Sequence, residues 1–210
     1  MNGFILEGQG SRGMHMLPAN AIYEDSDGAR EFDLRTLHLA DGVLFIQGRI
    51  DASMATQFAS CMLMLSRERR DARIYLNSEG GEVDAGLMMY DVMQGFPGKL
   101  EVFCVGRAAS MAALLLAGGQ KGRRYVLPHS RVMIHEPLIA GGLGGSASTI
   151  ERTAKGILEV RDLTNGIVAR HTGRTLEEVN RATERDNEMT AAQAVEFGIC
   201  DEIRGFFQEG

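Results

Sequence analysis

The amino-acid sequence predicts an α/β fold in which the sheet is covered on its faces. Short apolar runs of strand length alternate along the chain with segments whose apolar residues recur at helical spacing. The runs are continuously apolar, which is typical of strands that are buried on both faces. Connections between parallel strands are expected to be right-handed because of the chirality of the chain.

Length and composition are those of one globular unit. The chain has 210 residues, of which 44% are hydrophobic and 24% are charged, and a chain of this size can bury a substantial core. The formal net charge of -6 is spread along the sequence, with no basic stripe that would neutralise phosphates. We therefore expect no nucleic-acid partner.

Strands are predicted from apolar runs that are bounded by turn residues. The first run, at residues 43–47, lies between Asp41-Gly42 and Gly48. Further strands are predicted at residues 74–76, 100–105, 124–127 and 132–134. Residues 1–30 show no clear period and are rich in Gly, Asp and Asn, which favours an irregular and partly mobile segment. We therefore divide the chain into an N-terminal segment, 1–39, and a main domain, 40–210.

Helices are predicted where apolar residues share one face. These segments cover residues 54–65, 83–93, 111–117 and 149–171. Three pairs fit a capping box, which satisfies free amides of a first turn: Ser148 with Glu151, Thr175 with Glu178, and Thr190 with Gln193. Helices are expected to stop at Gly173 and Gly198.

The cysteines indicate a reducing location. Cys61, Cys104 and Cys200 are odd in number and far apart, which argues against a closed set of disulfides or a local metal site. The sequence shows neither a signal peptide nor a stretch long and apolar enough to span a membrane. We expect a cytoplasmic protein with no membrane partner, no metal ion and no cofactor.

Ser110 is the candidate nucleophile. It follows the strand at 100–105 and a short turn and then opens an apolar helix, so the amide of Met111 is expected at a helix N-terminus. The turn after the strand at 74–76 places the amide of Gly81 at the same edge of the sheet. Two such amides would form an oxyanion hole, although a serine at a helix start is more often only a cap.

His135 and Asp186 are the candidate base and its orienting group. His135 ends an apolar strand, so its ring is expected at the sheet edge where Ser110 opens a helix. Asp186 lies just before the cap at Thr190, from where it can turn inward. A serine hydroxyl is a poor nucleophile until a neighbouring base takes its proton, which is the role expected for His135.

Five stretches of the chain resemble one family of peptidases. They are residues 106–112, 131–138, 171–173, 183–186 and 194–203. The segments Ser-Met, Met-Ile-His-x-Pro and Thr-Glu-Arg-Asp, in this order, are similar to the proteolytic subunit of the ATP-dependent Clp protease, the ClpP family of serine peptidases. This resemblance covers about residues 43–203.

The resemblance implies a catalytic triad of Ser110, His135 and Asp186. It also implies that the amides of Gly81 and Met111 form the oxyanion hole. The implied fold is a crotonase-like α/β spiral with a protruding handle at about residues 136–172, which includes the glycine-rich segment 141–145.

Substrate and assembly are also implied by the resemblance. Val83 and Leu138 would line the pocket for the side chain beside the scissile bond, and the Leu138 backbone would pair with an extended peptide. The implied substrates are unfolded polypeptides, cleaved inside a chamber of two stacked seven-membered rings, a tetradecamer. An AAA+ unfoldase of the ClpX, ClpA or ClpC type would deliver them.

Two departures from the family keep other hypotheses open. Glu79 stands where the family usually has proline, so an extra carboxylate is expected near the oxyanion hole, and residues 1–39 differ from the usual N-terminal sequence. These differences favour, as an alternative, a weakly active or structural subunit that needs an active ClpP paralogue. A third hypothesis is a crotonase-type acyl-CoA hydratase or isomerase, which would need acid and base carboxylates at the site.

Overall fold

The computed structural model describes residues 3–5, 20–25, 28–138 and 144–207. The chain divides into two compact units, Met1–Leu44 and Phe45–Gly210. Among the described residues, no helix is both long enough and apolar enough to cross a membrane.

The first unit contains a small antiparallel sheet. Its strands are β1 (Gly3–Ile5), β2 (Asn20–Asp25) and β3 (Gly28–Asp33), in the order β1-β2-β3. Asp33 caps the N-terminus of helix α1 (Leu34–Ala40), and its carboxylate accepts hydrogen bonds from the amides of Arg35 (2.9 Å) and Thr36 (3.2 Å). The prediction of an irregular segment at 1–30 is wrong for these strands, because antiparallel pairing rests on backbone hydrogen bonds and needs no long apolar run.

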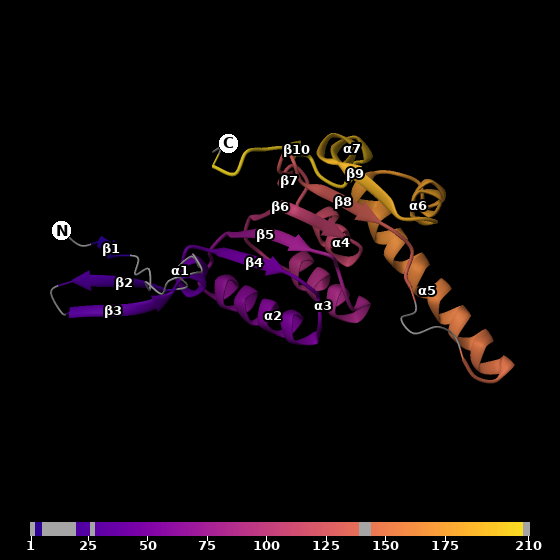
Figure 1. Cartoon of the computed structure of the whole chain (residues 1–210), viewed down its shortest axis with the longest axis horizontal. Helices are drawn as coiled ribbons and strands as arrows, with labels where there is room; N and C mark the ends of the chain where they lie inside the picture. Colours follow the sequence, from indigo (N-terminus) through magenta and orange to yellow (C-terminus); the bar gives the residue numbers. More distant parts are fainter. Residues whose placement is uncertain (1–2, 6–19, 26–27, 139–143, 208–210) are drawn as a thin grey trace, which may run out of the picture. The chain divides into compact units, whose positions relative to one another are not determined.

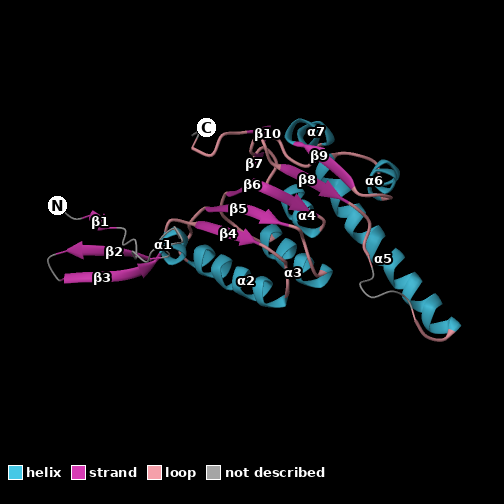
Figure 2. Ribbon diagram, viewed as in Figure 1, coloured by secondary structure: helices cyan, strands magenta, loops and turns pink. Residues whose placement is uncertain are grey.

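The larger sheet has seven strands in the described part of the chain (Figure 1; Figure 2). They are β4 (Val43–Gln47), β5 (Ala72–Ser78), β6 (Leu100–Ala109), β7 (Arg124–Val126), β8 (Arg131–Ile134), β9 (Asn187–Thr190) and β10 (Glu202–Ile203). The main path has the order β10-β7-β6-β5-β4, and β8 pairs with both β6 and β9. Strand β6 is parallel to β5, β7 and β8, whereas β8 and β9 are antiparallel. The predicted α/β fold is therefore confirmed.

The helices of the second unit alternate with its first strands. They are α2 (Ala52–Arg67), α3 (Val83–Gln94), α4 (Met111–Ala117), α5 (Ala147–Thr172), α6 (Leu176–Thr183) and α7 (Ala191–Phe197). Figure 2 shows α2 and α3 side by side next to β4 and β5. The apolar face predicted for α2 is the buried one, with Phe58, Met62 and Leu65 in the core. The four helices predicted from periodicity are confirmed, since they correspond to α2, α3, α4 and α5. The strands β9 and β10 were not predicted.

Only the second half of α5 is packed. Its buried residues begin at Thr164. The preceding part leaves Ile150 and Leu158 exposed, and Figure 1 shows it extending away from the sheet. Apolar side chains left exposed along a helix are typical of a surface that contacts another chain.

Strand β6 continues past the turn that the sequence predicts after residue 105. Its first part pairs with β7 and its last part with β8, where Ala109 lies opposite Met133. Gly106 has a φ of 100°, which only glycine adopts without strain, and its amide donates a hydrogen bond to Ser130 Oγ (2.8 Å). The predicted turn is therefore wrong, because the strand bends at Gly106 instead of ending there.

Two of the three predicted capping boxes are present. They are Thr175 with Glu178 and Thr190 with Gln193. The predicted glycine stops are C-caps with a left-handed backbone, Gly173 (φ 76°) and Gly198 (φ 94°). The third capping box, Ser148 with Glu151, is wrong, because α5 begins earlier and the hydroxyl of Ser146 accepts the hydrogen bond from the Thr149 amide (3.3 Å).

Arg124 connects four parts of the second unit. Its buried guanidinium donates from Nε to Asp201 Oδ2 (2.9 Å) and from Nη1 to the carbonyls of Ala117 and His171 (both 3.1 Å), at the ends of α4 and α5. Partial burial raises the pKa of the Asp201 carboxyl, but the hydrogen bonds and charge of Arg124 outweigh burial and hold this pKa below its ordinary 3.8. Arg124, which Asp201 neutralises, therefore fixes the ends of α4 and α5 against β7 through hydrogen bonds to their carbonyls.

Asp201→Asn should lower the free energy of unfolding near pH 7 by about 3 kcal/mol, because it leaves the buried Arg124 charge without a counter-charge. A depressed folded pKa means that the stabilisation is complete above the unfolded pKa and is lost as the pH falls through the folded pKa. Denaturant unfolding should therefore show a smaller difference between the two proteins near pH 3 than near pH 7.

The matched control is Glu202→Gln, because Glu202 pairs with Arg204 at the surface. This change should alter the free energy of unfolding by less than about 1 kcal/mol. Equal losses in the two variants would contradict the role given to the Arg124 pair.

Candidate active site

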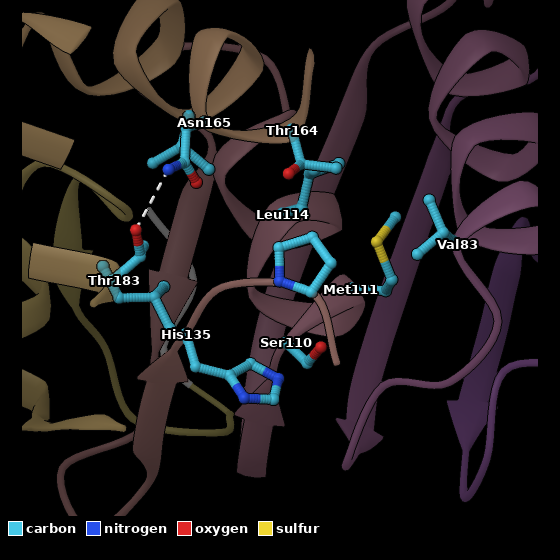
Figure 3. A pocket seen from close by; sticks show the side chains of 11 residues that line it. Val83, Ser110, Met111, Leu114, His135, Thr164, Asn165 and Thr183 are labelled. Atoms are coloured by element: carbon cyan, nitrogen blue, oxygen red, sulfur yellow. Dashed lines mark hydrogen bonds between the residues drawn. The ribbon is translucent and has the colours of Figure 1, made fainter. Parts of the chain in front are cut away.

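A small cavity lies in the second unit, where α4 and α5 meet the ends of β6 and β8 (Figure 3). Its volume is about 40 Å³. It is lined by Val83, Ser110, Met111, Leu114, Ile134, His135, Pro137, Thr164, Asn165, Val168 and Thr183. A mostly apolar cavity with a few polar groups is typical of a substrate pocket.

Ser110 occupies a strained junction between β6 and α4. Its backbone has φ 56° and ψ −122°, a region that residues other than glycine rarely adopt. Its amide donates a hydrogen bond to the carbonyl of Met133 on β8 (2.8 Å), which holds the junction to the neighbouring strand. The Ser110 hydroxyl makes no capping hydrogen bond to α4. The alternative of a serine that only caps its helix therefore does not apply.

The turn between β5 and α3 lies directly against Ser110. Gly80 has a φ of +86°, and a Cβ atom there would lie 2.6 Å from the Ala109 carbonyl oxygen, 2.8 Å from Ser110 Cβ and 2.9 Å from the Met111 nitrogen. No side chain fits in this space. The backbone of the turn therefore touches the backbone that carries Ser110.

The amides of Gly81 and Met111 lie beside this contact. Ile50 holds the turn, since its amide donates to the Gly80 carbonyl and its carbonyl accepts from the Glu82 amide (both 2.8 Å). Within the described part of the chain, neither the Gly81 amide nor the Met111 amide donates to a protein acceptor. Free backbone donors of this kind stabilise the negative oxygen that forms during acyl transfer.

Strand pairing brings His135 and Asp186 together. The antiparallel register of β8 and β9 places Ile134 opposite Asn187, so His135 and Asp186 face each other at the next position. His135 Nδ1 lies 3.4 Å from Asp186 Oδ1, and the side chains are 15% and 73% exposed. The position of Asp186 thus depends on β9, a strand that the sequence did not predict.

Ser110 and His135 lie on neighbouring strands and line the same cavity. The parallel register pairs Ala109 with Met133, so both side chains emerge at the same end of the sheet. Figure 3 shows the His135 ring beside the Ser110 side chain, with no hydrogen bond between these two residues. Such bonds are often long in enzymes without substrate and tighten when substrate binds.

The remaining predicted residues lie around the cavity. Val83, the first residue of α3, is in its lining, whereas Leu138 is outside the lining and 74% exposed. Glu79 is exposed and precedes Gly80 in the turn. Of the predicted handle loop, residues 139–143 lie outside the described part of the chain.

Several lining residues were not predicted from the sequence. They are Leu114, Ile134, Pro137, Thr164, Asn165, Val168 and Thr183. A signal existed for Thr164 and Asn165, because these polar residues fall on the face of α5 that also buries Ile167 and Val168. Polar side chains in the buried stripe of a helix need hydrogen-bond partners, so they mark positions with a specific environment.

The arrangement has the elements of acyl transfer chemistry. A serine with a free hydroxyl, a histidine on the next strand and two unbonded amides are the parts used by hydrolases that form an acyl-enzyme. The described residues that line the cavity include no Asp or Glu. The acid and base carboxylates that an acyl-CoA hydratase would need are therefore absent from this lining.

The fold is of mixed α/β architecture, and its cavity is lined by residue types that suit acyl transfer. The model of the Clp protease family matches residues 26–205, most of the chain, and the chain belongs to this family. The resemblance predicted from the sequence is therefore confirmed. Members of the family are peptidases, in general of the serine type, so the chain is placed among the peptidases.

Gly80→Ala should destabilise the protein by about 2–4 kcal/mol, since it adds left-handed strain of about 1 kcal/mol to overlap with the Ser110 backbone. Gly48→Ala is the matched control, because Gly48 also has a left-handed φ of +79° but no atom within 4 Å of a new Cβ. Its expected cost is only the strain. Equal losses for the two variants in denaturant unfolding would refute the close contact.

Proposed function

We propose that this protein is a serine endopeptidase that cleaves unfolded polypeptides inside an oligomeric chamber. Ser110 is the nucleophile, His135 is the general base and Asp186 orients the His135 ring. The observation that carries the proposal is the backbone of Ser110, which is strained at φ 56° while its hydroxyl stays free of helix capping.

Peptide-bond cleavage then follows two steps. The Ser110 oxygen attacks the carbonyl carbon of the substrate while His135 takes the hydroxyl proton, and the amides of Gly81 and Met111 stabilise the negative oxygen. His135 gives the proton to the leaving amine, and an acyl-enzyme remains. Water attacks the acyl carbon while His135 takes one of its protons, and His135 then returns this proton to the Ser110 oxygen as the acyl–oxygen bond breaks and the second product leaves.

Asp186 supports this cycle through the other ring nitrogen. With His135 Nδ1 3.4 Å from Asp186 Oδ1, the carboxylate favours the tautomer that leaves Nε2 free to accept the serine proton. It also stabilises the positive charge that the ring carries after the attack. The distance is longer than a good hydrogen bond, so a small movement on substrate binding or assembly would complete the triad.

Substrate side chains enter the cavity beside Ser110. Val83 is one wall of this pocket, and we assign Leu138 to pairing of its backbone with an extended peptide. Recognition through backbone hydrogen bonds tolerates many sequences, which suits a peptidase for unfolded chains.

Assembly into two stacked seven-membered rings is part of the proposal. The unpacked first half of α5, with Ile150 and Leu158 exposed, offers a surface for contact between rings. A closed chamber would keep folded proteins away from Ser110.

The three free cysteines, Cys61, Cys104 and Cys200, fit a cytoplasmic location.

An aromatic row on the sheet supports docking of an AAA+ unfoldase. Tyr75 lies at its centre, with ring centroids 5.4 Å from Phe45, 5.3 Å from Phe103 and 4.9 Å from Phe206. Phe45 and Phe206 are about half exposed. Partly exposed aromatic rings are enriched where proteins bind one another. We propose that an unfoldase of the ClpX, ClpA or ClpC type docks here and delivers unfolded chains.

A fluorophosphonate probe should label Ser110. Labelling should be lost in Ser110→Ala and in His135→Ala, and peptide cleavage should fall by more than about 1000-fold in each. Ser60→Ala is the matched control, because the Ser60 hydroxyl is exposed on α2 and bonded to the Thr56 carbonyl (3.0 Å). A correctly assembled wild type that takes up no probe would exclude the proposed nucleophile.

The second candidate function is a structural subunit that needs an active ClpP paralogue. It is favoured by the absence of a hydrogen bond between Ser110 and His135 and by the exposure of Asp186. Under our main proposal the chain purified alone forms rings with sevenfold symmetry and cleaves peptides. Rings without cleavage, which gain activity only when a paralogue is added, would establish the second candidate instead.

A further inference from the structure

One polar group in the cavity is not used by the proposed catalytic cycle. Asn165, on α5, lines the cavity and is only 3% exposed. A buried amide side chain needs partners for both its nitrogen and its oxygen, because an unpaired buried polar atom costs free energy. The partners of Asn165 therefore show which atom is left for a ligand.

The nitrogen of Asn165 is fully engaged. It donates to Asn180 Oδ1 (2.8 Å) and to Thr183 Oγ1 (3.0 Å). The Thr183 hydroxyl gives its own proton to the carbonyl of Val179 (3.0 Å), one turn earlier in α6. Because its own proton is used, the Thr183 hydroxyl can only accept a hydrogen bond from Asn165. The side-chain amide of Asn165 is therefore oriented with its nitrogen, not its oxygen, toward α6.

The oxygen of Asn165 consequently faces the other way. Figure 3 shows the nitrogen directed at Thr183 and the oxygen on the side of Leu114, within the group of lining side chains. No hydrogen bond to this oxygen is present among the described residues, and no fully buried side-chain oxygen in them lacks a partner, so the oxygen is accessible from the cavity that Asn165 lines. The neighbouring Thr164 offers no equivalent group, since its hydroxyl donates to the carbonyl of Val160 (3.0 Å).

We propose that Asn165 makes the cavity select substrate side chains that carry a neutral hydrogen-bond donor at their end. The inference rests on the proposed peptidase function, in which this cavity receives the side chain of the residue whose carbonyl Ser110 attacks. An apolar body packs against the walls, among them Val83, Met111 and Leu114, while the terminal O–H or N–H donates to Asn165 Oδ1. Tyrosine, threonine and glutamine have this composition.

The lining of the cavity disfavours substrate side chains that end in a positive charge. The described lining residues include no carboxylate that would pair with the ammonium of lysine, so burying that charge here is unfavourable. A purely apolar side chain is tolerated but leaves the oxygen of Asn165 without a donor. The net gain from one such hydrogen bond corresponds to about a three- to tenfold preference.

The test compares cleavage of peptides that differ in one terminal group. Three matched pairs are made with Tyr or Phe, Thr or Val, and Gln or Met at the residue before the scissile bond, and kcat/KM is measured on the assembled wild type. In the pair whose side chains are long enough to reach Asn165, the peptide with the hydrogen-bond donor should have a kcat/KM about three- to tenfold higher than its apolar counterpart. Ratios near one in all three pairs would overturn the inference.

Two variants separate selection from folding. Asn165→Leu should abolish the preference, whereas Thr164→Val should keep the ratio because the Thr164 hydroxyl is already bonded to α5. The wild-type ratios stand even if Asn165→Leu fails to fold. Equal cleavage within every pair, with fluorophosphonate labelling intact, would refute only the role of Asn165. Absence of both cleavage and labelling would refute the proposed function and this inference together.

Discussion

The contact between Gly80 and the backbone at Ser110 is the constraint on which the site depends. A single added Cβ would lie within 3 Å of three atoms from residues 109–111, so these two segments meet without any side chain between them. Because of this contact, the β5–α3 turn and the β6–α4 junction present their free amides at the same place. Preorganised amides need no rearrangement during the reaction, which is why such backbone contacts are effective in catalysis.

Two further features keep this contact in position. The bend of β6 at Gly106 lets the strand pair first with β7 and then with β8, and β8 carries both the carbonyl that holds Ser110 and the His135 ring. Arg124 ties the ends of α4 and α5 to the sheet. The proposed nucleophile and the proposed base thus lie on strands that pair with each other, while the Asp186 side chain remains exposed.

Most of the sheet and helix pattern could be predicted because each element carries a local signal. The strand at 43–47 is a continuous apolar run between turn residues, and it forms β4 with the same bounds. Where the local signal is weak, the prediction failed. The strands β2 and β9 contain no long apolar run and exist through pairing, and β6 runs past a glycine that would ordinarily end it. The Ser148 cap failed because Ser146 offers the same chemistry two residues earlier.

The sequence by itself determined the family and the types of residue at the site. Ser110, His135 and the glycines at 80 and 81 occur in short motifs whose order along the chain is specific, and such motifs are local. Only the tertiary structure decided how these groups stand to one another. The 3.4 Å approach of Asp186 to His135 comes from the register of β8 and β9, and the direction of the Asn165 oxygen comes from hydrogen bonds to α6. Both are long-range properties, because strand register and side-chain partners are set by residues far apart in the chain.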